Sequence, residues 1–244
     1  MILLTGATGT AGSLIANEFV RHRVPVRILA RDRAKAAALE NIPTVELVDG
    51  DMSKPGSLGL ALEGVDRVLM ISGPSMDLVE TQCTFIDACK SAGVRHVIKF
   101  SGLDARPETT FPFGLMHTEI EEYLENSGLA WTHLRPTGFM QEYLREAPSI
   151  VHEGALYLSL GDVKLNPIDL VDVAKVSFLL PRDGAHEGAR LPMTGPGSAD
   201  HDGSGQSHFT CKRKDGGVRG SASDRPATGV DSARYPSGVC RRSR

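Results

Sequence analysis

The 244-residue sequence lacks several features that mark whole classes of protein. No apolar run reaches the roughly 18 residues that a membrane span needs. No basic segment, apolar stretch and cleavage site precede the first strand-like residues, so nothing resembles an export signal. The four cysteines have no metal-ligand spacing. These absences predict a cytoplasmic protein with neither a membrane segment nor a metal site.

Residues 198–244 contain no leucine, isoleucine, methionine or tryptophan and are dense in glycine, serine and arginine. Such a segment cannot bury enough apolar surface to offset the entropy lost on ordering. It carries a net charge of +4, against −7 for residues 1–197. We expect a disordered or frame-altered tail. Because aromatic residues do not alternate with its charges, we expect no nucleic-acid partner.

Between residues 1 and 197, short apolar runs alternate with stretches of helical periodicity. Strands are predicted at 2–5, 24–30, 45–48, 67–71, 94–100 and 130–134, and helices at 11–22, 33–41, 55–63, 77–92 and 116–127, with a further amphipathic helix in "PIDLVDVAKVSFLL". Repeated strand-then-helix units predict an α/β fold with a doubly wound parallel sheet of the Rossmann type. We expect one domain over residues 1–197, with a small C-terminal substrate lobe drawn mainly from 136–197.

Three glycines in "MILLTGATGTAG" separate the first predicted strand from the first predicted helix. Glycines at this junction permit a tight turn, close approach of the backbone to a diphosphate and close packing of helix on strand. The free amides at the helix N-terminus then bind the phosphate charge. The spacing is G-x-x-G-x-x-G and not the general G-x-G-x-x-G, so the position after the first strand carries the argument. The predicted dinucleotide-binding loop comprises Gly6, Thr8, Gly9, Thr10, Ala11 and Gly12.

Several further segments occur in the same order as in one known family. They are "VRILARDRAKA", "VELVDGDM", "GVRHVIKFSG", "SGLAWTHLRPTGFM" and "EGARLPMTGP". With the glycine loop, they resemble the NmrA-like branch of the atypical short-chain dehydrogenase/reductases over residues 1–196. The resemblance implies an NAD(P)H-dependent reductase of quinones, dyes or similar conjugated small molecules. Its alternatives are a regulator that binds NAD(P) without turnover, and an isomerase or oxygenase on the same fold.

The residues after the second predicted strand indicate which nicotinamide cofactor binds. Arg31 stands at the end of that strand, and Arg33 follows two residues later. A guanidinium group suits the 2′-phosphate of NADP(H), so NADP(H) is favoured over NAD(H). Asp32 could instead bind a free ribose hydroxyl, but we interpret it as the N-cap of the following helix.

Further contacts follow from the family resemblance or from position at the sheet edge. The resemblance implies that Asp51 and Met52 flank the adenine and that Ser72, Gly73 and Pro74 lie near the middle of the cofactor. It also implies that Pro136 and Phe139, in "LRPTGFM", lie beside the nicotinamide. Ser101 ends the fifth predicted strand, at the carboxyl edge where ligands of doubly wound sheets collect.

The catalytic group is less well defined, because no tyrosine is followed four positions later by a lysine. The Tyr-x-x-x-Lys pair of the wider superfamily is therefore absent. His117, expected in the first turn of its helix, falls where isoflavone-reductase relatives carry a lysine. It could donate a proton or bind the nicotinamide ribose, or have no chemical role. Four glutamates on that helix are interpreted as a solvated face: Glu119, Glu121, Glu122 and Glu125. A homodimer is left open.

Overall fold

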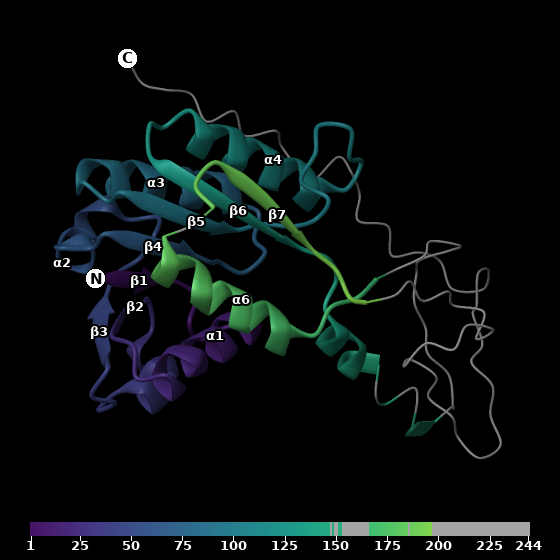
Figure 1. The fold of residues 1–244 in the computed structure, drawn as a ribbon, viewed down its shortest axis with the longest axis horizontal. Coiled ribbons are helices and arrows are strands. Elements are labelled where there is room, and N and C mark those ends of the chain that lie inside the picture. The colour runs from purple at the N-terminus through teal and green to yellow at the C-terminus, as the bar shows by residue number, and fades with distance from the viewer. Residues whose placement is uncertain (147, 149–150, 153–165, 185, 197–244) are drawn as a thin grey trace.

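A computed structural model describes residues 1–146, 148, 151–152, 166–184 and 186–196. Its centre is a seven-stranded sheet in the order β3-β2-β1-β4-β5-β6-β7, with every neighbouring pair parallel (Figure 1). The strands are β1 (Ile2–Leu4), β2 (Val26–Ala30), β3 (Val45–Asp49), β4 (Arg67–Met70), β5 (His96–Phe100), β6 (Ala130–Pro136) and β7 (Ala189–Met193). The predicted doubly wound α/β fold is confirmed.

Helices cover both faces of the sheet (Figure 1). The longer ones are α1 (Thr10–Arg21), α3 (Leu78–Ser91), α4 (Pro112–Glu125) and α6 (Leu170–Asp183), and the short ones are η1 (Arg33–Leu39), η2 (Pro55–Ser57), α2 (Gly59–Leu62) and η3 (Met140–Glu146). Helices α1 and α6 pack on one face around Phe19 and Phe178, whose ring centroids are 5.0 Å apart. Helices α3 and α4 bury a second apolar cluster on the other face.

The strand order places a ligand crevice at one edge of the sheet. Strand β1 pairs with β2 on one side and with β4 on the other, so the order of the chain reverses at β1. In open parallel sheets, ligands bind beyond the carboxyl ends of the strands at this reversal. The glycine loop leaves β1 at this point.

Some elements differ from their sequence-based expectation. The segment 33–41 forms the 3₁₀ helix η1, and 55–63 forms two short helices. Helix α4 begins at Pro112, so His117 lies in its second turn and not in its first. Strand β7, "ARLPM", was not predicted, because it contains a proline, which the sheet tolerates at an edge strand.

The C-terminal part of the predicted domain is only partly described. Helix α6 packs against α1, and β7 extends the main sheet. Phe139 forms an isolated parallel bridge with Ile168. Residues 153–165 and 197–244 lie outside the described residues, so the substrate lobe and the nature of the tail stay predictions. Among the described helices, none combines the length and the apolar character needed to cross a bilayer.

Candidate active site

Two glycines of the loop after β1 are required by its geometry. Gly6 has φ +66°, and a Cβ there would lie 2.7 Å from the carbonyl oxygen of Ile71. A Cβ on Gly12 would lie 2.1 Å from the carbonyl oxygen of Gly6. A side chain at Gly6 would therefore clash with the backbone after β4, and one at Gly12 would push α1 away from the loop, as expected for a loop that must let a ligand approach the backbone.

The N-terminus of α1 has free hydrogen-bond donors. Gly9 is the N-cap, and no side chain caps the helix. The Gly9 amide donates to Gly6, and the first amide bonded within the helix is that of Ser13. The amides of Thr10, Ala11 and Gly12 are therefore the donors left at this end. Three amides that have no partner among the described residues, at the positive end of a helix dipole, fit a diphosphate.

The predicted cofactor residues follow one another along the carboxyl edge of the sheet. Arg31 follows β2, the glycine loop follows β1, Ser72 follows β4, Ser101 follows β5 and Pro136 ends β6. From β2 to β5 there are three inter-strand steps of ~4.8 Å, or about 14 Å. An extended dinucleotide with its adenosine at β2 would place its nicotinamide beside β5 and β6.

At the adenosine end, the two arginines differ in how far the protein already uses them. Arg33 donates to Glu40 and to Asp49, each at 3.1 Å. Arg31 is exposed and makes no hydrogen bond or ion pair with any residue in the described ranges. The Asp32 carboxylate accepts the Ala34 amide at 3.1 Å, so its assignment as an N-cap is confirmed. Arg31 is therefore the cation available for a 2′-phosphate.

The residues after β3 and β4 vary in exposure. Partial burial acts to raise the pKa of Asp51, but hydrogen bonds from Ser53 and the nearby cations outweigh it, so the pKa is lowered. Met52 is buried in the apolar cluster under α3 and α4. Ser72 accepts a hydrogen bond from Gln82 at 2.8 Å, whereas Gly73 and Pro74 are exposed. Cofactor contacts by these residues stay predictions.

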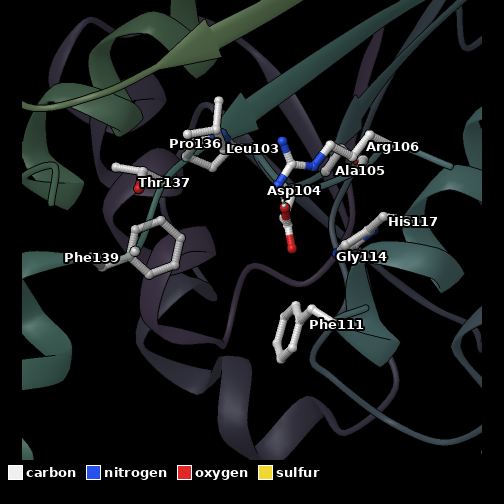
Figure 2. A pocket seen from close by; sticks show the side chains of 13 residues that line it. Leu103, Asp104, Ala105, Arg106, Phe111, Gly114, His117, Pro136, Thr137 and Phe139 are labelled. Carbon is white, nitrogen blue, oxygen red and sulfur yellow. Dashed lines mark ion pairs between the residues drawn. The ribbon is translucent and has the colours of Figure 1, made fainter. Parts of the chain in front are cut away.

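A pocket of about 390 Å³ lies at the ends of β5 and β6. Ser101, His117, Pro136 and Phe139, which come from separate parts of the sequence, all line it. Phe111 and Phe139 lie on opposite sides of the pocket (Figure 2). Its lining combines apolar side chains with polar ones, including the ion pair between Asp104 and Arg106, and such mixed concave linings bind small molecules.

A buried polar network lies behind this pocket. The Lys99 side chain on β5 is wholly buried, and its Nζ lies 2.8 Å from Nδ1 of His117 and 3.2 Å from Oγ of Ser101. The Ser101 hydroxyl donates to Oε1 of Glu121 at 2.5 Å. Glu121 also forms a two-pronged ion pair with Arg135. One continuous chain of hydrogen bonds thus joins a buried carboxylate to a side chain that lines the pocket.

Burial changes the protonation of two members of this network. Desolvation lowers the pKa of Lys99 to about 7, with Arg135 acting in the same direction and Glu121 against it. Desolvation, reinforced by the charge of Lys99, lowers the pKa of His117 to about 2. His117 is therefore a neutral imidazole at physiological pH, and Lys99 exchanges its proton in the physiological range.

Sequence reasoning missed much of this network. Glu121 was interpreted as part of a solvated helix face, but it is 2% exposed and is held by Ser101 and Arg135. Two signals point to the network in retrospect. Lys99 interrupts an otherwise apolar strand that is covered on both faces, and Glu121 is four residues after His117, on the same side of α4.

Glu121, Glu125 and His133 also bring potential metal-ligand atoms within 4.8 Å of one another. Both carboxylates already bind guanidinium groups, Glu121 that of Arg135 and Glu125 that of Arg190. Nε2 of His133 donates to the Glu125 carboxylate at 3.0 Å. The cluster is a set of ion pairs between α4 and the sheet, and a cation there would have to displace the arginines.

Comparison with known proteins agrees with this geometry. Residues 6–177 match a family model described as NAD(P)H-binding. The chain is 36% identical to an NAD(P)H azoreductase of Xenophilus azovorans over 196 residues, covering 80% of this chain and 68% of the relative.

Two solved structures share the fold. An NADPH-dependent quinone oxidoreductase from Escherichia coli, complexed with NADPH, superposes with a TM-score of 0.77 at 28% identity, over 83% of this chain and 72% of that one. A triphenylmethane reductase from Citrobacter sp., complexed with NADP(H), gives 0.75 at 25% identity with the same coverage. The chain therefore belongs to the NAD(P)H-binding family and is an NAD(P)H-dependent reductase of its NmrA-like quinone- and dye-reducing branch.

Proposed function

We propose that this chain binds NADPH in preference to NADH and reduces flat, conjugated acceptors in the pocket between Phe111 and Phe139. The observation that carries the proposal is the position of this pocket, at the ends of β5 and β6, on the same sheet edge as the glycine loop. A dinucleotide extended along this edge from β2 would bring its nicotinamide beside an acceptor in the pocket.

The preference for NADPH rests on Arg31. Its guanidinium group is exposed and uncommitted among the described residues, whereas that of Arg33 is held by Glu40 and Asp49. A planar cation with several donors binds a phosphate dianion through charge-assisted hydrogen bonds. A free ribose hydroxyl offers no such partner, so NADH should bind more weakly.

The protein's own contribution to the reaction is to position the cofactor and the acceptor, to exclude water from them and to donate a hydrogen bond to the acceptor. The amides of Thr10, Ala11 and Gly12 would hold the diphosphate, and the aromatic side chains would orient the acceptor. When bound, NADPH supplies the hydride, which is the difficult part of the chemistry. His117, neutral and at the pocket wall, would donate a hydrogen bond to the acceptor atom that becomes negative.

The acceptor classes to test come from the relatives, whose names specify azo compounds, quinones and triphenylmethane dyes. All three classes are conjugated molecules that accept a hydride. We also propose a cytoplasmic location, where NADPH is available, and leave the homodimer as an expectation.

The test is NADPH oxidation by the purified full-length chain with one acceptor from each class, followed by the absorbance of NADPH. We expect turnover with at least one class and a lower KM for NADPH than for NADH. Phe139→Ala should raise the acceptor KM about tenfold or more, because one aromatic face of the pocket is removed. Leu60→Ala, an exposed apolar position outside the pocket lining, is the control. Absence of oxidation with every acceptor would refute the proposal.

A further inference from the structure

Burying the Lys99 side chain costs free energy because its ammonium group is removed from water, and no packing requirement explains a lysine at this position. Its side chain is 0% exposed on β5, and among the described residues no carboxylate lies within ion-pair distance of its Nζ. Its partners are the Ser101 hydroxyl and the His117 ring. Replacing a buried charge by an apolar side chain of similar volume is often neutral or stabilising. A buried lysine in this position therefore points to a chemical role.

While Lys99 is protonated, its contact with His117 also fixes which nitrogen of the ring carries a proton. A protonated lysine has three donors and no acceptor, so Nδ1, at 2.8 Å from Nζ, must accept. A neutral imidazole that accepts at Nδ1 carries its proton on Nε2. Nε2 makes no hydrogen bond to a described residue, and the ring lines the pocket. His117 therefore presents a donor to whatever occupies the pocket.

We propose that Lys99 and His117 form a proton relay that delivers, through Nε2 of His117, the proton required by acceptors that are reduced on oxygen or nitrogen. The inference rests on the proposed reductase function. As hydride reaches the acceptor, the Nε2–H bond breaks and an O–H or N–H bond forms on the acceptor. The Nζ proton of Lys99 passes to Nδ1, which leaves a neutral imidazole and a neutral amine. After the product leaves, a solvent proton that enters through the pocket binds Nε2 of His117, and the proton on Nδ1 returns to Nζ, which restores the ammonium and the starting tautomer.

The relay avoids a charged imidazole at every stage. Because burial and Lys99 hold the pKa of His117 near 2, the ring gains a proton at Nδ1 only as it loses one at Nε2. Lys99 is the group that supplies the second proton. The titratable and charged groups around it come from three elements: His117 and Glu121 on α4, Arg135 and His133 on β6, and Cys83 on α3. Because the pKa of Lys99 is near 7, Lys99 loses this proton as the pH rises above neutrality.

The chemistry of the acceptors separates the relay from a structural role. A quinone gains a hydride and must also gain a proton on oxygen. A cationic triphenylmethane dye gains a hydride on its central carbon, becomes neutral and needs no proton. Loss of the relay should therefore slow quinone reduction and spare dye reduction at the same site.

The experiment compares single-turnover oxidation of NADPH by the full-length wild-type protein and by Lys99→Met, with a quinone and with a cationic triphenylmethane dye. We expect Lys99→Met to slow quinone reduction at least tenfold and to change the dye rate less than twofold. In the wild type, the quinone rate should fall up to tenfold per pH unit above about pH 7, while the dye rate stays level. His96→Gln, a buried substitution at the other end of β5, should change neither rate by more than twofold.

Three results would overturn the relay: an equal loss with both acceptors in Lys99→Met, a quinone rate that does not depend on pH, or a wild-type protein that reduces the dye but not the quinone. A wild-type protein that reduces neither would instead refute the proposed function.

A second readout needs no turnover. Nitrogen NMR of the imidazoles should show His117 protonated at Nε2 in the wild type, and this tautomer preference should weaken in Lys99→Met. A His117 ring protonated at Nδ1 in the wild type would contradict the relay.

Discussion

Gly12 is the residue at which the phosphate loop tolerates least change. In Gly12→Ala the new Cβ would lie 2.1 Å from the backbone oxygen of Gly6, so the loop or α1 must shift. We expect a loss of about 1–3 kcal/mol in the free energy of unfolding and a NADPH affinity reduced at least tenfold. Urea denaturation and fluorescence titration measure the two effects. Gly56→Ala, where no atom lies within 4 Å of the new Cβ, is the control and should change neither.

Arg31 should control the choice between the two nicotinamide cofactors. Arg31→Ala removes an exposed cation without breaking a hydrogen bond to any described residue, so the fold should be unaffected. We expect NADPH to bind about tenfold more weakly, which corresponds to about 1.4 kcal/mol, while the affinity for NADH stays the same. Calorimetric titration with both cofactors measures this, with Arg21→Ala as the control. An equal loss of both affinities would argue against a 2′-phosphate contact.

Lys99 should also leave a signature in the pH dependence of stability. Its pKa falls from 10.5 in the unfolded chain to about 7 in the fold, so the unfolded state binds more protons between these two values. Stability contributed by this group therefore rises with pH across that window, with a slope of up to about 1.4 kcal/mol per pH unit. The difference between wild type and Lys99→Met in urea denaturation should show this slope. No slope in the difference would mean that Lys99 titrates normally in the fold.

The glycine loop could be predicted from the sequence, whereas the buried network could not. Gly6 and Gly12 are set by local chain geometry, which leaves a local sequence pattern. Lys99, Ser101, His117 and Glu121 meet only because β5 and α4 pack against each other. The two sequence signals, a lysine in a mainly apolar strand and a glutamate four residues after a histidine, also fit ordinary strand and surface residues, so they identify the network only once the packing is known.

At the scale of elements, the contact between α1 and α6 supports the helix that carries the phosphate-binding amides. Phe19 of α1 meets Phe178 of α6 edge to face, and His22 stacks on the same ring at 4.8 Å. Phe178→Ala should cost about 3–5 kcal/mol and should weaken NADPH binding as α1 loosens. Leu179→Ala, an exposed neighbour on α6, should cost less than 1 kcal/mol. Urea denaturation of both variants tests this; similar losses would contradict the proposed support.

The predicted strands 2–5 through 130–134 were recovered because strands covered on both faces are continuous apolar runs. Strand β7 was missed because Arg190 and Pro192 interrupt its apolar pattern at the edge of the sheet. The segment predicted as one helix at 55–63 is broken because Gly56 and Gly59 disfavour a continuous helix. These errors lie at the periphery of the fold, so the order and direction of the central strands are unaffected.

At the scale of the whole molecule, the site is a property of the sheet and not of any one motif. Under the proposed function, successive strands would supply the cation for the cofactor's phosphate, the amides for the diphosphate, the middle of the crevice and the acceptor pocket. Sequence periodicity predicts the strands, but their order, which brings β4 and β5 beside β1, places these groups in line. The topology thus turns residues distant in the sequence into one continuous binding edge.

The most direct test of the account is rapid mixing of the full-length chain and NADPH with a panel of quinone, azo and triphenylmethane acceptors, followed by the absorbance of NADPH. We expect the absorbance to fall with at least one acceptor, faster with NADPH than with NADH at subsaturating cofactor. An absorbance that stays constant with every acceptor, for a folded protein, would contradict hydride transfer at this sheet edge.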